Sequence, residues 1–188
     1  MDLGEKKVRW STVVHKARVS ISDLDHNRYD LVRFSIVRSP REGQGEWLLR
    51  ILAYCMQEIE NGVFLEDQGS EKTPSLVLKD MSEQIMHWYT FALRTVKEIR
   101  QIAGRSQKVS IWFVEDEQTR RNWQKVCKDY WKLDKVEVCC FSRAWIEKLN
   151  SLCPKNCVWT LTMEGGKMWL VAENEMLNVR FDILKPHK

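Results

Sequence analysis

A strand pattern, a polar turn, a second strand pattern and a helix pattern follow one another near the middle of the chain, and together they restrict the fold strongly. Residues 75–80 and 84–92 are rich in β-branched and aromatic residues, and residues 81–83 supply the polar turn between them. This arrangement predicts a β-hairpin. A basic helix is expected over residues 94–103, and the apolar run 108–114 predicts a further strand. Strands separated by a helix need a crossover connection, so we expect part of the sheet to be parallel.

The rest of the chain continues the alternation of strands and helices. Further strands are expected over residues 12–22, 29–37, 135–141, 158–163, 168–171 and 179–184, and helices over residues 42–60, 118–130 and 143–152. Residues 61–73, rich in Glu, Asp, Gly and Ser, are expected to form a loop. The order predicts an α/β fold: a mixed sheet flanked by helices, with β-hairpins near the N- and C-terminal ends. We expect one domain over residues 1–188, with residues 1–11 flexible.

The composition of the chain excludes few classes of function. The chain has 188 residues, a formal net charge of +4 and a pI near 8.7. This mildly basic balance is compatible with a nucleic-acid partner and does not require one. The N-terminal segment lacks the apolar run of a signal peptide, and no stretch approaches the roughly 20 apolar residues of a membrane helix. We therefore expect a cytoplasmic protein without a membrane partner.

The six cysteines are expected to be reduced thiols, as is usual in the cytoplasm. Cys153 and Cys157 have a spacing that would suit half of a zinc site, with Cys139 and Cys140 or His187 as the remaining ligands. No second ligand pair follows at a standard spacing, so the favoured interpretation is a loop with two ordinary thiols.

Three histidines and one acidic triplet are candidates for functional residues. His15 is expected to be exposed on a strand, and His26 to be solvated in a turn. Because side chains alternate between the two faces of a strand, His87 points to the face opposite that of Trp88. A structural role for His87 in the strand is favoured over a role as general base. The acidic residues 115–117 precede a predicted helix, where the helix dipole favours negative charge, and this explains them without a metal.

Several segments resemble the YaeQ family when they are taken together. The stretch 16–25, Lys-Ala-Arg-Val-Ser-Ile-Ser-Asp-Leu-Asp, is similar to the opening of that family, as is the helical stretch 49–54. Pro74 and Trp88 keep the spacing of the family, and the stretch 168–170, Met-Trp-Leu, fits its last hairpin. The resemblance covers the chain from about Val14 onward. It implies a restriction-endonuclease-like core of the PD-(D/E)xK type, in a family whose members are mostly uncharacterised.

The same resemblance indicates where the metal-binding acids of such a nuclease would lie. Its first-helix glutamate falls on Gly45, its Pro-acid position on Ser75, and the acid and glycine of its Trp-x-acid-x-Gly strand on Thr90 and Ala92. The position of the lysine in an acid-x-Lys motif is also Ala92. Magnesium-dependent hydrolysis needs carboxylates to hold the ion and activate water. We therefore expect a nuclease-like fold without catalysis, without a metal site and without a cofactor.

The alternative is a metal-dependent nuclease whose carboxylates have moved. Glu46 is one place beyond Gly45, and Asp80 and Glu83 lie at the turn of the central hairpin. Only in this case would Mg²⁺ be a cofactor. Glu42 and Glu46 would share one helix face, which is expected to face solvent rather than a site.

Two binding functions are also compatible with the sequence. Arg94, Lys97, Arg100 and Arg105 follow the hairpin, with Lys108 close in sequence, and predict a basic face that could bind DNA or RNA weakly through phosphates. The second possibility is a protein-interaction module that uses exposed tryptophans.

Overall fold

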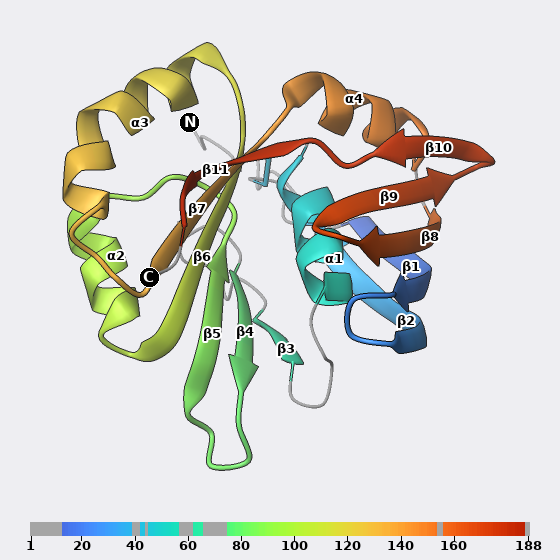
Figure 1. Ribbon diagram of the computed structural model, residues 1–188, viewed down its shortest axis with the longest axis horizontal. Helices are drawn as coiled ribbons and strands as arrows, with labels where there is room; N and C mark the ends of the chain where they lie inside the picture. The colour runs from blue at the N-terminus through green and yellow to red at the C-terminus, as the bar shows by residue number, and fades with distance from the viewer. Residues whose placement is uncertain are drawn as a thin grey trace, which may run out of the picture.

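The computed structural model describes residues 13–38, 42–43, 45–56, 62–65, 75–153 and 156–186, with the backbone alone described for Val13, Ser75 and residues 62–65 (Figure 1). The elements follow in the order β1 (Val13–Asp23), β2 (Arg28–Arg38), α1 (Glu46–Met56), β3 (Gly62–Leu65), β4 (Ser75–Lys79), β5 (Ile85–Thr90), α2 (Val96–Ala103), β6 (Ser106–Val114), α3 (Glu117–Tyr130), β7 (Val136–Phe141), α4 (Arg143–Ser151), β8 (Asn156–Glu164), β9 (Lys167–Ala172), β10 (Glu175–Asn178) and β11 (Phe181–Lys185).

The strands form two mixed sheets. Sheet A has the order β10-β9-β8-β1-β2, and sheet B the order β11-β7-β6-β5-β4-β3. In sheet A the two predicted hairpins, β1–β2 and β8–β9, are joined by parallel pairing of β1 with β8. In sheet B the three strands β5, β6 and β7 are parallel, and their neighbours at both edges pair antiparallel.

Helix α1 lies between the two sheets (Figure 1). Eight of its residues are buried, on all sides of the helix: Trp47, Leu48, Leu49, Arg50, Ile51, Leu52, Ala53 and Cys55. A helix that is apolar all round belongs in a protein interior. Its hydrophobic cluster includes residues of both sheets and of α4, so α1 is the element on which the two sheets pack.

One ion pair is buried beside α1. Arg50 Nε lies 2.8 Å from Glu42 Oε1, and both side chains are almost wholly buried. Arg50 Nη2 also donates to Glu42 Oε2 at 2.9 Å and to the carbonyl of Val37 at 2.7 Å. Glu42 therefore holds the segment before α1 against β2, and the expectation that Glu42 faces solvent is wrong.

Helices α2 and α3 cover the other face of sheet B and share a second hydrophobic cluster with it. Both begin at a capping box. Thr95 accepts from the N–H of Glu98 in α2, and Asp116 accepts from the N–H of Thr119 in α3, and each partner side chain returns a hydrogen bond. These caps fix where the two helices start, a few residues after β5 and β6.

The predicted fold class is confirmed: the protein is α/β, with mixed sheets, flanking helices and hairpins near both ends. Three details are corrected. There are two sheets rather than one, because the terminal hairpins pair with each other and not with the central strands. The stretch expected to be a loop contains β3, and a further strand, β10, follows β9.

The expected helix over residues 42–60 starts later, at Glu46, since Glu42 and Gly43 lie outside it. Residues 57–60, residues 1–11 with their expected flexibility, Pro74 and His187 lie outside the described residues. None of the helices that the structure describes has both the length and the apolar character needed to cross a membrane.

Candidate functional site

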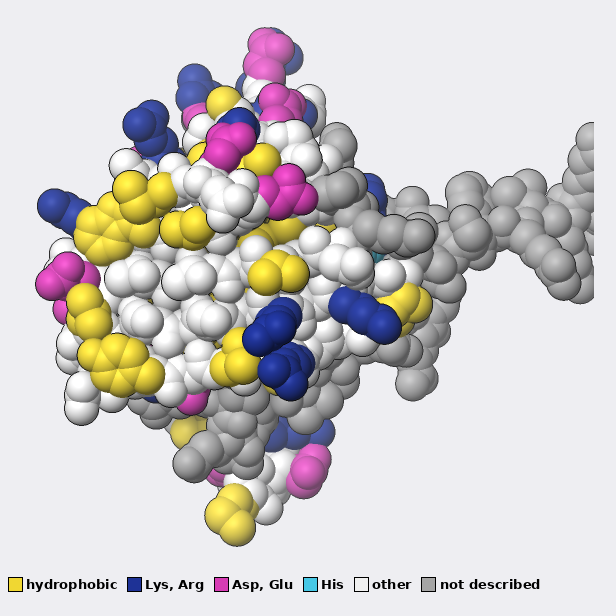
Figure 2. Space-filling model, turned by 90° about the vertical axis from the view of Figure 1, so that its right-hand side faces the viewer, with side chains coloured by type: hydrophobic (Ala, Val, Ile, Leu, Met, Phe, Trp, Pro, Cys, Tyr) yellow, Lys and Arg dark blue, Asp and Glu magenta, His cyan; other side chains and the backbone are white. Residues whose placement is uncertain are grey.

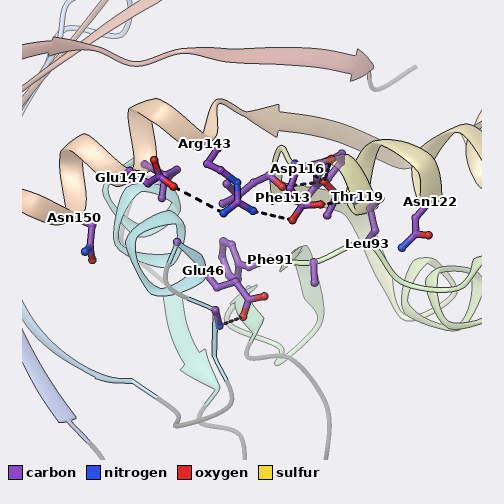
Figure 3. Close-up of a pocket in the computed structure, with 15 residues that line it drawn as sticks. Glu46, Phe91, Leu93, Phe113, Asp116, Thr119, Asn122, Arg143, Glu147 and Asn150 are labelled. Carbon is purple, nitrogen blue, oxygen red and sulfur yellow. Dashed lines mark hydrogen bonds and ion pairs between the residues drawn. The ribbon is translucent and has the colours of Figure 1, made fainter.

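A cavity of about 260 Å³ opens at the carboxyl ends of the parallel strands β5, β6 and β7. Segments that follow these strands line it, together with the first turn of α1 and one side of α4 (Figure 3). Ligand sites of open α/β sheets commonly lie at this end of the strands. We therefore take this cavity, called the strand-end pocket below, as the candidate functional site.

Glu46 lies in the first turn of α1 and faces the strand-end pocket (Figure 3). Its Oε2 accepts a hydrogen bond of 2.9 Å from the backbone N–H of Gly43. Burial raises the pKa of the Glu46 carboxyl, while that hydrogen bond and the nearby guanidinium groups of Arg50 and Arg94 act in the opposite direction. A carboxyl in this setting has a weakened preference for its charged form.

Arg143 stands across the strand-end pocket from Glu46, at the start of α4 (Figure 3). Its Nη2 donates to Asp116 Oδ2 at 2.9 Å, and its Nη1 lies 3.9 Å from Glu147 Oε1. Asp116 also caps α3, and the hydrogen bond from the Thr119 N–H is the largest of the effects that lower the pKa of Asp116. The strand-end pocket thus carries three carboxylates and one guanidinium, with two of the carboxylates already paired to it.

Gly45 lies on the wall of the strand-end pocket, at the position that the resemblance pairs with the first nuclease glutamate. A Cβ added there would lie 2.7 Å from Cγ2 of Ile146 and 2.7 Å from Cγ2 of Val114. Such distances are below any van der Waals contact, so a side chain at this position has no space. The place of the first family acid is therefore filled by apolar side chains of α4 and β6.

The three other family positions lie on β4, on β5 and just after β5. Ser75 and Thr90 are partners in the β4–β5 ladder, and Ala92 lines the strand-end pocket. Thr90 is fully buried, and its hydroxyl accepts a hydrogen bond of 2.9 Å from Nε of Arg94. A buried hydroxyl therefore stands where the resemblance implies a nuclease acid.

Asp80 and Glu83 lie at the opposite end of the same hairpin. In the β4–β5 ladder Ser75 faces Thr90 at one end, and Lys79 faces Ile85 at the other, about 13 Å away along β4. Asp80 Oδ1 accepts from Ser82 and Gln84 and so closes the turn, while Glu83 pairs with Lys79 at 2.8 Å. The two acids stabilise the turn and do not lie with Glu46, so the convergence that the relocated-carboxylate alternative would need is not seen. Over the described residues, no group of three or more His, Cys, Asp or Glu side chains could hold a metal ion.

The residues of the predicted basic face do not all lie on one exposed surface. Lys97 and Arg100 are exposed on α2, and Arg105 is exposed just after it. Arg94 precedes α2 and its side chain is only 10% exposed, because it binds Thr90 and lies 3.8 Å from Glu98. Arg94 is therefore a neighbour of the strand-end pocket rather than a member of the basic face.

The histidines differ from their expected settings in one case. His15 was expected to be exposed, but it is buried, and its ring stacks on Trp47 of α1 with centroids 4.2 Å apart. His26 is an exposed turn residue whose Nδ1 lies 2.9 Å from Asp23 Oδ2. His87 is half-buried, with Nε2 2.8 Å from Ser110 Oγ and its ring stacked on Tyr89. None of the three lines the strand-end pocket.

Cys153 and Cys157 are both buried and hydrogen-bond to each other, which lowers the pKa of Cys153 and raises that of Cys157. Cys153 Sγ also accepts from Trp159 Nε1 at 2.7 Å. Cys139 has Glu137 as its own polar neighbour. Both thiols therefore belong to the core, Cys153 just after α4 and Cys157 within β8.

Sequence reasoning missed Arg143, Glu147 and the pocket-lining role of Asp116. The acidic stretch 115–117 could have indicated that Asp116 lines the site, because a helix cap that follows a parallel strand lies at the carboxyl edge of the sheet. Nothing local in the sequence shows that α4 brings Arg143 to the same place.

Comparisons with known proteins agree on one family. The model of the family described as "YaeQ protein" matches residues 10–181. YaeQ of Salmonella typhi, described as uncharacterised, is 21% identical over 167 residues, which is 89% of this chain and 92% of the relative. YaeQ of Escherichia coli, also described as uncharacterised, is 20% identical over 166 residues, 88% of this chain and 92% of that relative.

Two crystal structures support the fold. The YaeQ protein of Xanthomonas axonopodis superposes with a TM-score of 0.84 at 16% identity, covering 93% of this chain and 99% of that one. The YaeQ protein of Pseudomonas syringae superposes with a TM-score of 0.85 at 19% identity, covering 94% and 97%. With the family model matching most of its length, this chain belongs to the YaeQ family.

Proposed function

We propose that this YaeQ-family protein is a binding protein that engages nucleic acid weakly, without sequence preference and without cleaving it. The observation that carries the proposal is the closed position at Gly45. A nuclease glutamate there would overlap Ile146 and Val114, each 2.7 Å from the site of its Cβ. With Thr90 and Ala92 also lacking a carboxylate, the ligands that hold Mg²⁺ in such sites are missing from their expected places.

The charge of the strand-end pocket supports the same proposal. Glu46, Asp116 and Glu147 face a single guanidinium, that of Arg143. The positive N-terminus of α3 is already occupied by its own cap, Asp116. A phosphodiester entering this pocket without a divalent cation would meet uncompensated carboxylates. Nucleic acid is therefore expected to bind outside the pocket, on a basic surface.

Exposed cations on and after α2 offer one such surface. Lys97, Arg100 and Arg105 project into solvent, and Lys135 lies at the end of α2, where its Nζ contacts the carbonyls of Ala103 and Ser106. Contacts of this kind bind phosphates without reading sequence. The protein-interaction alternative has less support, because Trp131 is the one tryptophan among the described residues that is classed as exposed.

Calorimetric titration with Mn²⁺ tests the absence of a metal site. The wild-type protein should give no saturable heat, and Glu46→Ala should behave identically. Tight binding that disappears in Glu46→Ala would establish the relocated-carboxylate nuclease and end the proposal. Asp80→Ala is the matched control, because Asp80 lies at the far end of the hairpin.

A further inference from the structure

The outer face of sheet A is left without a covering helix among the described elements. Side chains of β1 alternate: Ala17, Val19 and Ile21 are buried toward α1, while Lys16 and Arg18 point outward and are exposed. The same alternation runs through β2, β8 and β9. Figure 2 looks onto this side of the molecule, where some Lys and Arg side chains stand near the middle and others, with acidic side chains, lie along the upper and left edges.

Three cations meet in a shallow hollow on this face. Lys16, Arg18 and Arg33 line a depression of about 460 Å³, together with Ser35 and Asn156. Arg18 and Arg33 are direct partners across the β1–β2 ladder. No carboxylate lines the hollow, and among the described residues none forms an ion pair with any of the three cations.

Like charges placed directly opposite each other in a sheet are unfavourable unless an anion lies between them. The hollow therefore has the composition of an anion site: two guanidinium groups, an ammonium, a hydroxyl and an amide, all on rigid strands. Guanidinium groups suit phosphate in particular, because their donors match its oxygens in pairs.

Exposed apolar side chains surround these cations. Val158 is 64% exposed and pairs in register with Arg18 of β1. Leu31 and Tyr29 lie on the same face of β2 as Arg33. Met176 is 69% exposed on β10. Surfaces that bind single strands combine cations that contact the backbone with aromatic side chains on which bases stack, and Tyr29, 63% exposed, is the aromatic residue among these.

We propose that the outer face of sheet A binds single-stranded nucleic acid, with phosphates on Lys16, Arg18 and Arg33 and bases on the neighbouring apolar side chains. This inference rests on the proposed function and assigns its principal surface. A duplex fits poorly, because the major groove admits a helix or a two-stranded ribbon and hides base faces. A second copy of this chain fits poorly too, since a two-fold contact would bring the same cations together.

The proposal predicts how the affinity for a single strand depends on salt concentration. Three phosphate contacts to a single strand give a slope of about −2 in log K against log salt, so affinity should fall roughly 20-fold between about 50 and 200 mM salt. The test uses fluorescence anisotropy of a labelled oligothymidylate of about 12 nucleotides. Arg18→Glu/Arg33→Glu should lower the affinity at least tenfold and flatten the slope, and Arg18→Thr/Arg33→Thr should do so to a smaller degree.

Two variants with the same change of charge serve as comparisons. Lys125→Glu/Lys128→Glu, on the exposed side of α3, should change affinity less than threefold. Lys97→Glu/Arg100→Glu tests the α2 face: a large loss there with none in the sheet variants overturns this inference and leaves the proposed function in place.

Two other outcomes are decisive. No binding of the oligonucleotide by wild-type protein at low salt overturns both proposals. Binding of polyglutamate through Arg18 and Arg33 without binding of the oligonucleotide would assign the face to an acidic protein partner instead. Near-ultraviolet circular dichroism confirms that each variant is folded.

Discussion

Gly45→Ala is the smallest change that tests whether the site of the first family acid is closed. Gly45 has no positive φ, so alanine causes no backbone strain there. Alanine also lowers the conformational entropy of the unfolded chain, which should stabilise the folded protein by about 0.4–1 kcal/mol. Its methyl group would nevertheless lie 2.7 Å from Ile146 and from Val114. Overpacking of this kind costs about 1–3 kcal/mol. We therefore expect a net loss of roughly 1–2 kcal/mol in the free energy of unfolding.

Urea-induced unfolding, followed by tryptophan fluorescence, measures this loss. Gly104→Ala is the matched control, because a Cβ there would meet its nearest neighbours, two backbone oxygens, at 3.4 and 3.6 Å, and this variant should be neutral or slightly stabilised. Ile146→Leu removes one of the two methyl groups that obstruct Gly45, so the cost of Gly45→Ala should shrink by at least about 0.5 kcal/mol in that background. If Gly45→Ala is as stable as Gly104→Ala, the position is open and the argument against a carboxylate there fails.

Two further predictions concern buried charge. Arg50→Met should lower the free energy of unfolding by about 3–5 kcal/mol because it leaves Glu42 buried without its partner, and adding Glu42→Leu should restore most of the loss in the same urea assay. Burial raises the pKa of Glu46, so its contribution to stability is complete at low pH and is lost as the pH rises through its folded-state pKa. Glu46→Gln should therefore raise Tm at about pH 7 and change it little at about pH 4, and calorimetric scans showing the opposite trend would contradict a desolvated carboxyl.

Local sequence patterns predicted the hairpins, the buried strands and the start of one helix. The alternation in β1 and β2 and in β8 and β9 is set by one buried face, so both hairpins were predicted to within about two residues. The apolar runs of β6 and β7 are buried on both faces, which is why they read as continuous hydrophobic stretches. Capping residues likewise marked the start of α3.

Contacts distant in the sequence were not predictable in the same way. The pairing of β1 with β8 depends on two hairpins more than a hundred residues apart, and no spacing rule connects them. The burial of His15 follows from Trp47, which is placed by α1. Arg94 was expected on a basic helix face, but the cap at Thr95 starts α2 after it and leaves its side chain near Thr90.

One measurement tests the central claim most directly. A single-stranded oligonucleotide, end-labelled and incubated with excess protein and Mg²⁺ or Mn²⁺, is divided between a native gel and a denaturing gel. We predict a retarded band on the native gel at low salt and intact, full-length oligonucleotide on the denaturing gel. Metal-dependent cleavage that is lost in Glu46→Gln would contradict the account and identify the protein as a nuclease.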